Sequence, residues 1–338
     1  MITIRLETDD VGFVFDTDYH LSDVPPGRRA KTYSHEVLAK IRHNNKLAHK
    51  IGAVRLCGGD VYHVKNPRNA EANSHGLQTR IECEFRQAPL GTIFGVPGNH
   101  DLWMDRPDSV PSQPIGAIIA SGAFTDLSSE SVIFENRTGT VRVQVDAYPY
   151  LHDDMAALDR ILNAPPRAEG VTYRILINHQ YGNPGDQPYM HTKDHPTIGF
   201  NRMAECDYDL CLWGHDHSRT ETVTVGNCTH VRLGSLSRAS LAGDEVDRPV
   251  SAAVFRITEK GVKYKEVEVP VQPLKIAFTI GDRGVDKVDE SPAVTTFFTA
   301  MDSAVAEVET SDPREILYSL CPVEERYVAD LAVQVCGV

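Results

Sequence analysis

The sequence predicts an α/β protein whose parallel strands end together at one edge of a sheet. Five short, mainly apolar runs each finish in Gly, Asp or His, which is typical of buried strands that lead into a turn. Helical patterns separate the early runs, and this alternation predicts β-α-β units. The five runs are VGFVFDTDYH, IGAVRLCGGD, LGTIFGVPGNHD, RILINHQYG and YDLCLWGHDH.

The first helix is expected at 34–51, where Val37, Leu38 and Ile41 fall on one face and Ser34 is placed to cap the start. A second helix is expected at 71–87. After residue 220 the pattern changes to short strands separated by Gly and Asn, which predicts an antiparallel meander that closes a second sheet. These strands are expected at 220–225, 229–233, 250–257 and 262–269.

A domain boundary is expected in VPVQPLK, which divides the chain into a catalytic domain, 1–269, and a small helical C-terminal extension, 270–338. The extension is acidic, so it is expected to bind a protein partner or a second copy of the chain. Asp312 and Pro313 fit the start of a helix. Helices are expected at 292–309, 312–320 and 323–335.

Composition indicates an ordinary soluble protein, with 338 residues, 41% apolar and 24% charged. No apolar stretch approaches the roughly 18 residues of a membrane span, and MITIRLETDD has no secretory h-region. We therefore expect a cytoplasmic protein with no membrane partner. Its 7 cysteines form no CxxC pair, which favours reduced thiols over disulfides or a zinc cluster.

Charge is uneven along the chain, although the net charge is −13. Residues 25–86 are rich in Lys and Arg, whereas 270–338 are rich in Asp and Glu. A local basic face can attract a polyanion whatever the net charge of the whole chain. The alternative is that these basic residues form ordinary solvated helix faces.

Polar side chains follow each predicted strand, and because parallel strands end at one edge, they are expected to converge there. Imidazoles, carboxylates and an amide oxygen suit manganese, iron or zinc. The set is too large for one tetrahedral ion, but a carboxylate shared by two ions would accommodate it. Taken alone, His179 would more often be a hydrogen-bonded core residue. The converging residues are Asp18, His20, Asp60, Asn99, His179, His215 and His217.

The motifs TDYH, GGD, GNHD, INHQ and GHDH, in this order, resemble those of the calcineurin-like metallophosphoesterases. The resemblance implies a four-layer α-β-β-α sandwich of two mixed sheets. It implies that His100 assists the leaving group and that Asp101 orients His100. It also implies that a hydroxide between two divalent ions attacks phosphorus in line. One ion would take Asp18, His20, Asp60 and His217, and the other Asp60, Asn99, His179 and His215.

Further segments are similar to the SbcD-type nucleases of DNA double-strand-break repair. They are DYHLSDVPPGRRAKTYSHEVLAKI, GGDVYH, KNPRN and LGSLSR. This likeness implies a manganese-dependent DNA exo- or endonuclease of repair or recombination, with an SMC-like ATPase of the SbcC type as partner. His63 would lie near the metals, and DNA phosphates would meet Arg28, Arg29, Lys65 and Arg68.

Two alternatives keep the same fold. One is a small-substrate phosphodiesterase acting on cyclic nucleotides or similar diesters, for which the loop 180–200, with His191 and His195, should close over a narrow pocket. The other is a catalytically idle scaffold, which is disfavoured because no ligand of the motif set is missing.

Overall fold

Two mixed β-sheets lie against each other in the computed structural model, which describes residues 1–65, 68–185, 197–241, 243–246 and 248–279. One sheet has the strand order β1 (Ile2–Arg5), β6 (Val132–Glu135), β7 (Arg142–Tyr148), β8 (Tyr173–Asn178), β11 (Leu210–Trp213), β13 (Cys228–Arg232), β12 (Val223–Val225). The other has the order β15 (Gly261–Glu268), β14 (Ser251–Thr258), β2 (Val11–Asp16), β3 (Ala53–Cys57), β4 (Ile93–Gly95), β5 (Phe124–Asp126). A short pair joins β9 (Gly182–Asn183) to β10 (Ile198–Gly199).

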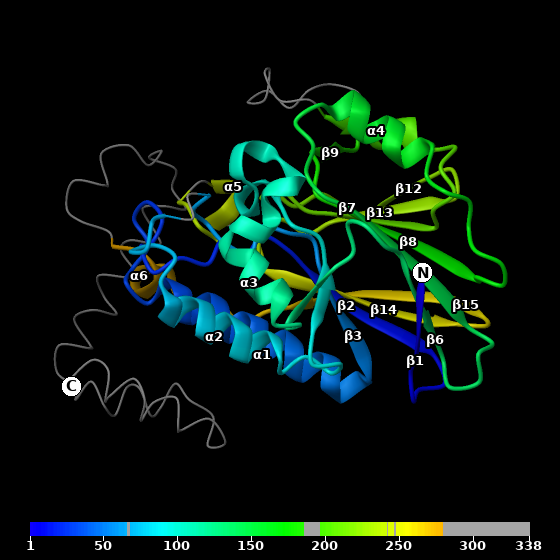
Figure 1. Ribbon diagram of the computed structural model, residues 1–338, viewed down its shortest axis with the longest axis horizontal. Coiled ribbons are helices and arrows are strands. Elements are labelled where there is room, and N and C mark those ends of the chain that lie inside the picture. Colours follow the sequence, from blue (N-terminus) through cyan, green and yellow to red (C-terminus); the bar gives the residue numbers. More distant parts are fainter. Residues whose placement is uncertain (66–67, 186–196, 242, 247, 280–338) are drawn as a thin grey trace, which may run out of the picture. The chain divides into compact units, whose positions relative to one another are not determined.

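Helices cover the outer faces of both sheets, so the described part of the chain has four layers (Figure 1). The helices α1 (Tyr33–Ile51), α2 (His75–Phe85) and α3 (Pro114–Ala120) pack on the six-stranded sheet, and α4 (Asp154–Leu162) packs on the seven-stranded sheet. A separate core, built from the facing strands, lies between the sheets. The predicted α-β-β-α sandwich is therefore confirmed.

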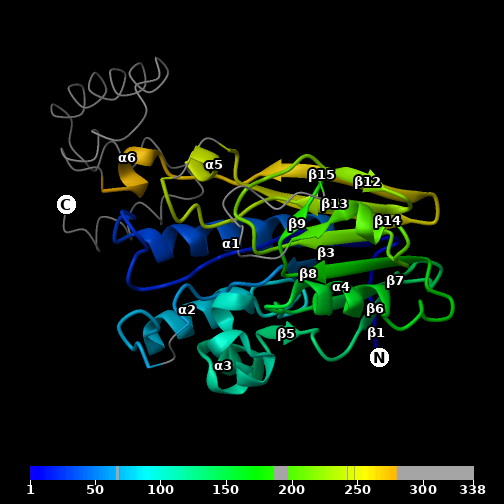
Figure 2. The ribbon, with the colours of Figure 1, turned by 90° about the horizontal axis from the view of Figure 1, so that it is seen from above.

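Shorter helical segments complete the fold. Figure 2 shows α6 (Leu274–Ala277) beside the start of α1, where Ala30 N donates to Ala277 O at 2.9 Å. The others are α5 (Gly243–Val246), η1 (Asn99–Asp101), η2 (Trp103–Asp105), η3 (Pro107–Ser112) and η4 (Phe200–Met203). None of the helices within the described residues is long and apolar enough to cross a membrane.

The five strands expected from apolar runs are confirmed as β2, β3, β4, β8 and β11. Both expected helices are present, but their starts differ. Ser34 is not the cap of α1, because its Oγ donates to Ser22 O at 2.6 Å and Thr32 holds the N-cap position. The second helix begins later than expected, since Ser74 accepts from Leu77 N at 3.0 Å and caps α2.

The expected antiparallel meander after residue 220 is wrong. Strands β12 and β13 extend the seven-stranded sheet, where β13 pairs with β11 in parallel. Strands β14 and β15 instead extend the six-stranded sheet, where β14 pairs antiparallel with β2. Local patterns specify each hairpin, but the sheet that a hairpin joins depends on apolar faces distant in sequence.

The N-terminal compact unit ends at Thr279 rather than at 269. Phe278 is buried and lies 4.6 Å from the Arg29 guanidinium, and Thr279 N donates to Arg28 O at 2.7 Å. Residues 270–279 therefore belong to this unit. The expected helices at 292–309, 312–320 and 323–335 lie outside the described residues.

Candidate metal centre

Both sheets contribute side chains to one site at the carboxyl ends of their strands. The six-stranded sheet supplies Asp18 and His20 after β2, Asp60 after β3, and Asn99 after β4. The seven-stranded sheet supplies His179 after β8, and His215 and His217 after β11. The structure thus brings together all seven residues that the sequence places at strand ends.

The first group consists of Asp18, His20 and His217, whose ligand atoms lie within 4.8 Å of one another. The Nε2 atoms of His20 and His217 are 2.8 Å apart. Asp18 Oδ1 lies 3.9 Å from His20 Nε2 and 4.0 Å from His217 Nε2. Three donors therefore face a common point.

The second group consists of Asp60, His179 and His215, again within 4.8 Å of one another. Asn99 Oδ1 joins it, at 3.2 Å from His179 Nε2 and 2.8 Å from His215 Nδ1. Asp60 spans both groups, because Oδ1 lies 3.4 Å from His179 Nε2 and Oδ2 lies 3.5 Å from His20 Nε2. A shared carboxylate between two ions has this arrangement.

The backbone at four of these residues adopts the left-handed conformation, which is uncommon outside glycine. The φ angles are 57° at Asp18, 47° at His20, 53° at Asp60 and 78° at His215. Such strain is concentrated at functional sites, where surrounding packing imposes it. At Gly59, with φ 110°, an added Cβ would lie 2.5 Å from His179 Nδ1. Only a glycine at this position therefore lets the loop come so close to His179.

Burial and mutual charge set the protonation of the site. Burial lowers the pKa values of His20 and His215 well below the usual range, so both rings are neutral. Burial opposes protonation of His179 as well, but Asp60 raises the pKa of His179 to about 9. Burial also lowers the pKa of His217, but the bond to Glu245 and the nearby carboxylate charges together raise it to about 9.

These residues fit two divalent cations. The donor set is four imidazoles, two carboxylates and an amide oxygen, which suits ions such as manganese, iron or zinc. His215 Nε2 is buried without a hydrogen-bond partner among the described residues. The protons on His179 and His217 supply positive charge beside Asp60 and Asp18, a role that cations would take over.

Hydrogen bonds behind the donors hold the rings in place. His179 Nδ1 donates to Gly58 O at 2.6 Å, which fixes the ring with Nε2 facing the site. His217 Nδ1 lies 3.3 Å from Glu245 Oε1, and Ser240 Oγ donates to the same oxygen at 3.0 Å. Such partners fix ring orientation and raise ligand basicity. Glu245 could not be singled out from the sequence, because no motif marks it.

His100 lies beside the shared carboxylate. Its backbone N donates to Asp60 Oδ1 at 2.8 Å, and its ring Nδ1 donates to His63 O at 2.5 Å. Asp101 is expected to orient His100, but the structure gives its carboxylate backbone partners rather than the His100 ring. The carboxylate of Asp101 instead accepts from the backbone N–H groups of Val61 at 3.0 Å, Tyr62 at 2.9 Å and Gly98 at 3.0 Å. Asp101 therefore orders the loops that carry Asp60 and Asn99.

His63 lies against the first group. Its Nδ1 is 3.5 Å from His20 Nδ1, and its ring stacks on His100 with centroids 5.6 Å apart. Burial, followed by the charge of His100, lowers the pKa of His63 to about 4. A neutral imidazole is thus held next to His20 and His100.

The basic residues expected at DNA are mostly engaged within the fold. Arg29 is wrong as a phosphate contact, because it is buried, pairs with Glu36, and stacks between Tyr33 and Phe278. Lys65 pairs with Asp105 at 2.8 Å. Arg28 and Arg68 are exposed. Elsewhere in 25–86, basic residues are paired in Arg42–Glu84, Arg55–Asp16, Arg80–Asp23 and Arg86–Glu82.

Two tyrosines that the sequence analysis did not single out border the second group. The ring centroid of Tyr181 is 3.9 Å from that of His215, and that of Tyr150 is 4.9 Å away. Tyr181 opens the loop 180–200. His191 and His195 of that loop lie outside the described residues.

Comparisons with known proteins give structural likeness only. No family model and no curated protein matches the sequence. A conserved uncharacterized protein of Streptococcus pneumoniae, described as a predicted phosphoesterase, is similar at 12% identity over 78% of this chain and 94% of its own, with a TM-score of 0.34.

Two structures of Vps29 are similar to about the same degree. That of Chaetomium thermophilum has 13% identity over 78% of this chain and 97% of its own, with a TM-score of 0.30. A single mutant from Entamoeba histolytica has 13% identity over 77% and 100%, with a TM-score of 0.30. The interpretation of the site therefore depends on its own geometry.

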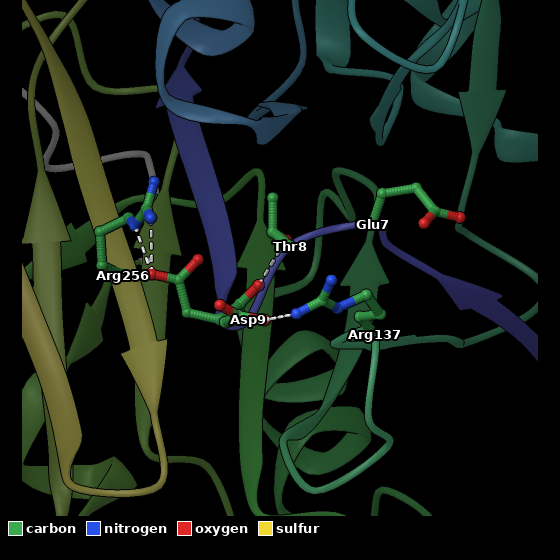
Figure 3. A pocket seen from close by; sticks show the side chains of 6 residues that line it. Glu7, Thr8, Asp9, Arg137 and Arg256 are labelled. Carbon is green, nitrogen blue, oxygen red and sulfur yellow. Dashed lines mark hydrogen bonds and ion pairs between the residues drawn. The ribbon is translucent and has the colours of Figure 1, made fainter.

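A shallow pocket at the opposite edge of the sheets is not part of this centre (Figure 3). It lies where β2 begins, whereas the metal-binding candidates follow the end of β2. Its arginines are already paired, Arg137 with Asp9 at 2.6 Å and Arg256 with Asp10 at 2.6 Å. These ion pairs leave little net charge for an anion.

Proposed function

We propose that the chain is a dinuclear, metal-dependent phosphodiester hydrolase. The observation that carries this proposal is the pair of donor groups that share Asp60, with His100 hydrogen-bonded to the same carboxylate. Two divalent ions held there would lower the pKa of water and neutralise phosphate oxygens. Asp18, His20 and His217 would hold one ion, and Asn99, His179 and His215 the other, with Asp60 common to both.

His100 is the candidate proton donor to the leaving oxygen. Since a carbonyl oxygen only accepts, the bond to His63 O places a proton on His100 Nδ1 and fixes the ring. Its Nε2 is then the nitrogen that gains or releases a proton during the reaction. Asp101 supports this indirectly, through the backbone of the loops around His100.

Within this class we propose DNA as the substrate, manganese as the working ion, and a cytoplasmic repair or recombination nuclease as the role. The support is the sequence resemblance to the SbcD-type nucleases and the position of His63 beside both His20 and His100. Exposed Arg28 and Arg68 are the candidate phosphate contacts. An SMC-like ATPase or a second copy would bind the acidic C-terminal region, and retained binding after deletion of 280–338 would contradict this.

A second candidate is hydrolysis of small phosphodiesters such as cyclic nucleotides. It is favoured by the internal pairing of the basic residues in 25–86, which leaves fewer cations for a long polyanion. Tyr150 and Tyr181 beside His215 would then flank a compact substrate.

The test is a parallel assay with manganese on linear double- and single-stranded DNA, bis-p-nitrophenyl phosphate and cyclic AMP. His100→Ala and a chelator should abolish hydrolysis, whereas His49→Ala, at an exposed position on α1, should not. DNA cleavage would support the nuclease. Small-diester hydrolysis with intact DNA, even with a partner ATPase, would favour the second candidate. No hydrolysis of any diester by metal-loaded protein would overturn the proposal.

A further inference from the structure

Three cysteines converge on the outer face of the seven-stranded sheet, away from the metal centre described above. The thiol sulfurs of Cys206, Cys211 and Cys228 lie within 4.8 Å of one another, and those of Cys211 and Cys228 are 3.3 Å apart. None of the three is in a disulfide. Sequence spacing gave no sign of this cluster, because no two of these residues form a CxxC pair.

The sheet register explains how the thiols meet. Strands β11 and β13 pair in parallel, with Cys211 opposite His230. Because side chains alternate along a strand, Cys228 lies on the same face as His230 and hence as Cys211. Cys206 enters from the turn after η4, where its backbone N donates to Met203 O at 3.0 Å. Three separate segments therefore supply the cluster.

The cluster lies in an apolar layer with one access route. Phe200, Met203 and Trp213 pack around it beneath α4, and Cys211 and Cys228 are buried. Cys206 is partly exposed, so an ion could enter from its side. The apolar surroundings favour soft sulfur ligands over hydrated oxygen ligands.

The donor set suits a cation. The Cys228 thiol hydrogen-bonds to Cys211 Sγ at 3.3 Å, and Cys206 Sγ lies within 4.8 Å of both. Three sulfur atoms that face one another in this way are ligands that thiophilic ions prefer.

A neighbouring histidine has a ring nitrogen without a hydrogen-bond partner among the described residues. His230 is buried, and its Nδ1 accepts from Trp213 Nε1 at 3.2 Å. Since the indole only donates, the proton of the neutral ring is on Nε2, which has no hydrogen-bond partner among the described residues. An N–H group without a partner favours negative charge nearby, and thiolates bound to a metal ion would supply that charge.

We propose that Cys206, Cys211 and Cys228 form a structural site for a thiophilic metal ion, separate from the dinuclear centre. The ion would be Zn²⁺ with a fourth, non-protein donor, or Cu⁺ with the three sulfurs alone. On binding, the thiols of Cys206, Cys211 and Cys228 each release a proton to solvent. No oxidation or reduction is involved.

Such a site would link η4, β11 and β13 at one point. Strand β11 runs from Leu210 to Trp213, and the turn directly after it carries His215 and His217. Fixing β11 would therefore stabilise the segment that carries two ligands of the dinuclear centre. The proposed site goes beyond the proposed function, and it could exist whether or not the chain hydrolyses phosphodiesters.

The test uses Co²⁺ as a spectroscopic probe of full-length protein, stripped of metal and kept reduced. A thiolate-to-cobalt charge-transfer band requires sulfur ligands, which the nitrogen and oxygen donors of the dinuclear centre cannot provide. The band should appear with about one equivalent of thiolate-bound cobalt. It should persist in Asp60→Asn, which impairs the dinuclear centre, and in Cys83→Ser, at an exposed cysteine outside the cluster.

Cys211→Ser and Cys228→Ser should lose the band. Cys206→Ser, at the partly exposed position, provides a variant that should fold if the buried ones do not. Competition with Zn²⁺ and with Cu⁺ then tells which ion displaces cobalt. Absence of the band in folded wild-type protein, or a disulfide between two of these cysteines in protein freshly isolated from cells, would overturn the proposal.

Discussion

The Nε2 atoms of His20 and His217 face each other at 2.8 Å, although the two residues follow strands of different sheets. Two imidazole nitrogens can approach this closely without an ion only if one carries a proton and the other accepts it. A cation between them would replace that proton and bind both sheets through side chains. Metal binding and the docking of the sheets are therefore coupled.

Asp60→Asn should affect both ions, because Asp60 contacts both His20 and His179. His217→Ala should affect only the first group. Elemental analysis after dialysis against limiting manganese should give close to two ions in the wild type, about one in His217→Ala and fewer in Asp60→Asn. Asp108→Asn, at an exposed ion pair with Arg106, serves as the control. Equal loss in both site variants would contradict a shared carboxylate.

Glu245→Gln should weaken metal binding without removing a ligand. The amide keeps the shape of the side chain but not the charge that supports His217 at 3.3 Å. Loss of such a supporting partner typically lowers metal affinity by about 10- to 100-fold. Chelator competition measures the change. An unchanged affinity would show that the Glu245–His217 contact does not support the metal.

Gly98→Ala should disrupt the centre by crowding. An added Cβ would overlap Asp60 Oδ1 and the Asp60 backbone N. Overpacking of this kind costs about 1–3 kcal/mol of unfolding free energy, and here it should also reduce metal content. Gly76→Ala is the matched control, since its Cβ would meet only Ser74 Oγ at 3.5 Å within α2. Normal metal content in Gly98→Ala would contradict the close approach of Gly98 to Asp60.

Arg29→Ala should reduce stability rather than substrate affinity. Its guanidinium is buried against Phe278 and pairs with Glu36, which would keep its ion pair with Lys40 at 2.9 Å. Breaking a buried ion pair costs about 3 kcal/mol or more, measurable by urea denaturation. Arg28→Ala, at the exposed neighbour, should stay within about 0.5 kcal/mol of the wild type. Equal stability of the two variants would mean that the contacts of Arg29 with Glu36 and Phe278 do not stabilise the fold.

Metal-free protein should lose stability as the pH falls from about 6.5 to about 4. Burial lowers the pKa of His230 to about 4, so in this window the unfolded chain binds a proton that the folded chain excludes. The stabilising contribution is complete above the unfolded pKa and lost by about pH 4. It amounts to roughly 3 kcal/mol.

His230→Phe should flatten that part of the stability profile, because phenylalanine has no proton to gain and can still stack on Phe200. Urea denaturation at several pH values, with a chelator present, measures the slope for both proteins. A slope in His230→Phe as steep as that of the wild type would assign the pH dependence to other groups.

Local pattern accounts for the strand ends and for much of the candidate site. Each apolar run predicts a buried strand, and the topology of parallel strands brings Asp18 and Asp60 to one edge of their sheet without any knowledge of side-chain contacts. His179 reaches the same kind of edge on the other sheet, and the packing of the two sheets brings it to the site. The helix 34–51 could likewise be predicted, since its apolar periodicity is local.

Contacts between distant segments could not be predicted in this way. The position of β13 beside β11, the approach of Glu245 to His217, and the burial of Arg29 under Phe278 all join residues with no shared local pattern. The same holds for the meeting of Cys206 with Cys211 and Cys228.

The sequence by itself determined the types and order of the donor residues, because periodicity and turn chemistry act over a few neighbouring positions. Only the tertiary structure decided which carboxylate spans both groups, which histidine has a carboxylate behind it, and which basic side chains are internally paired. The physical reason is that these outcomes depend on packing two sheets together. Burial and distance-dependent charge interactions then act between residues far apart in the chain.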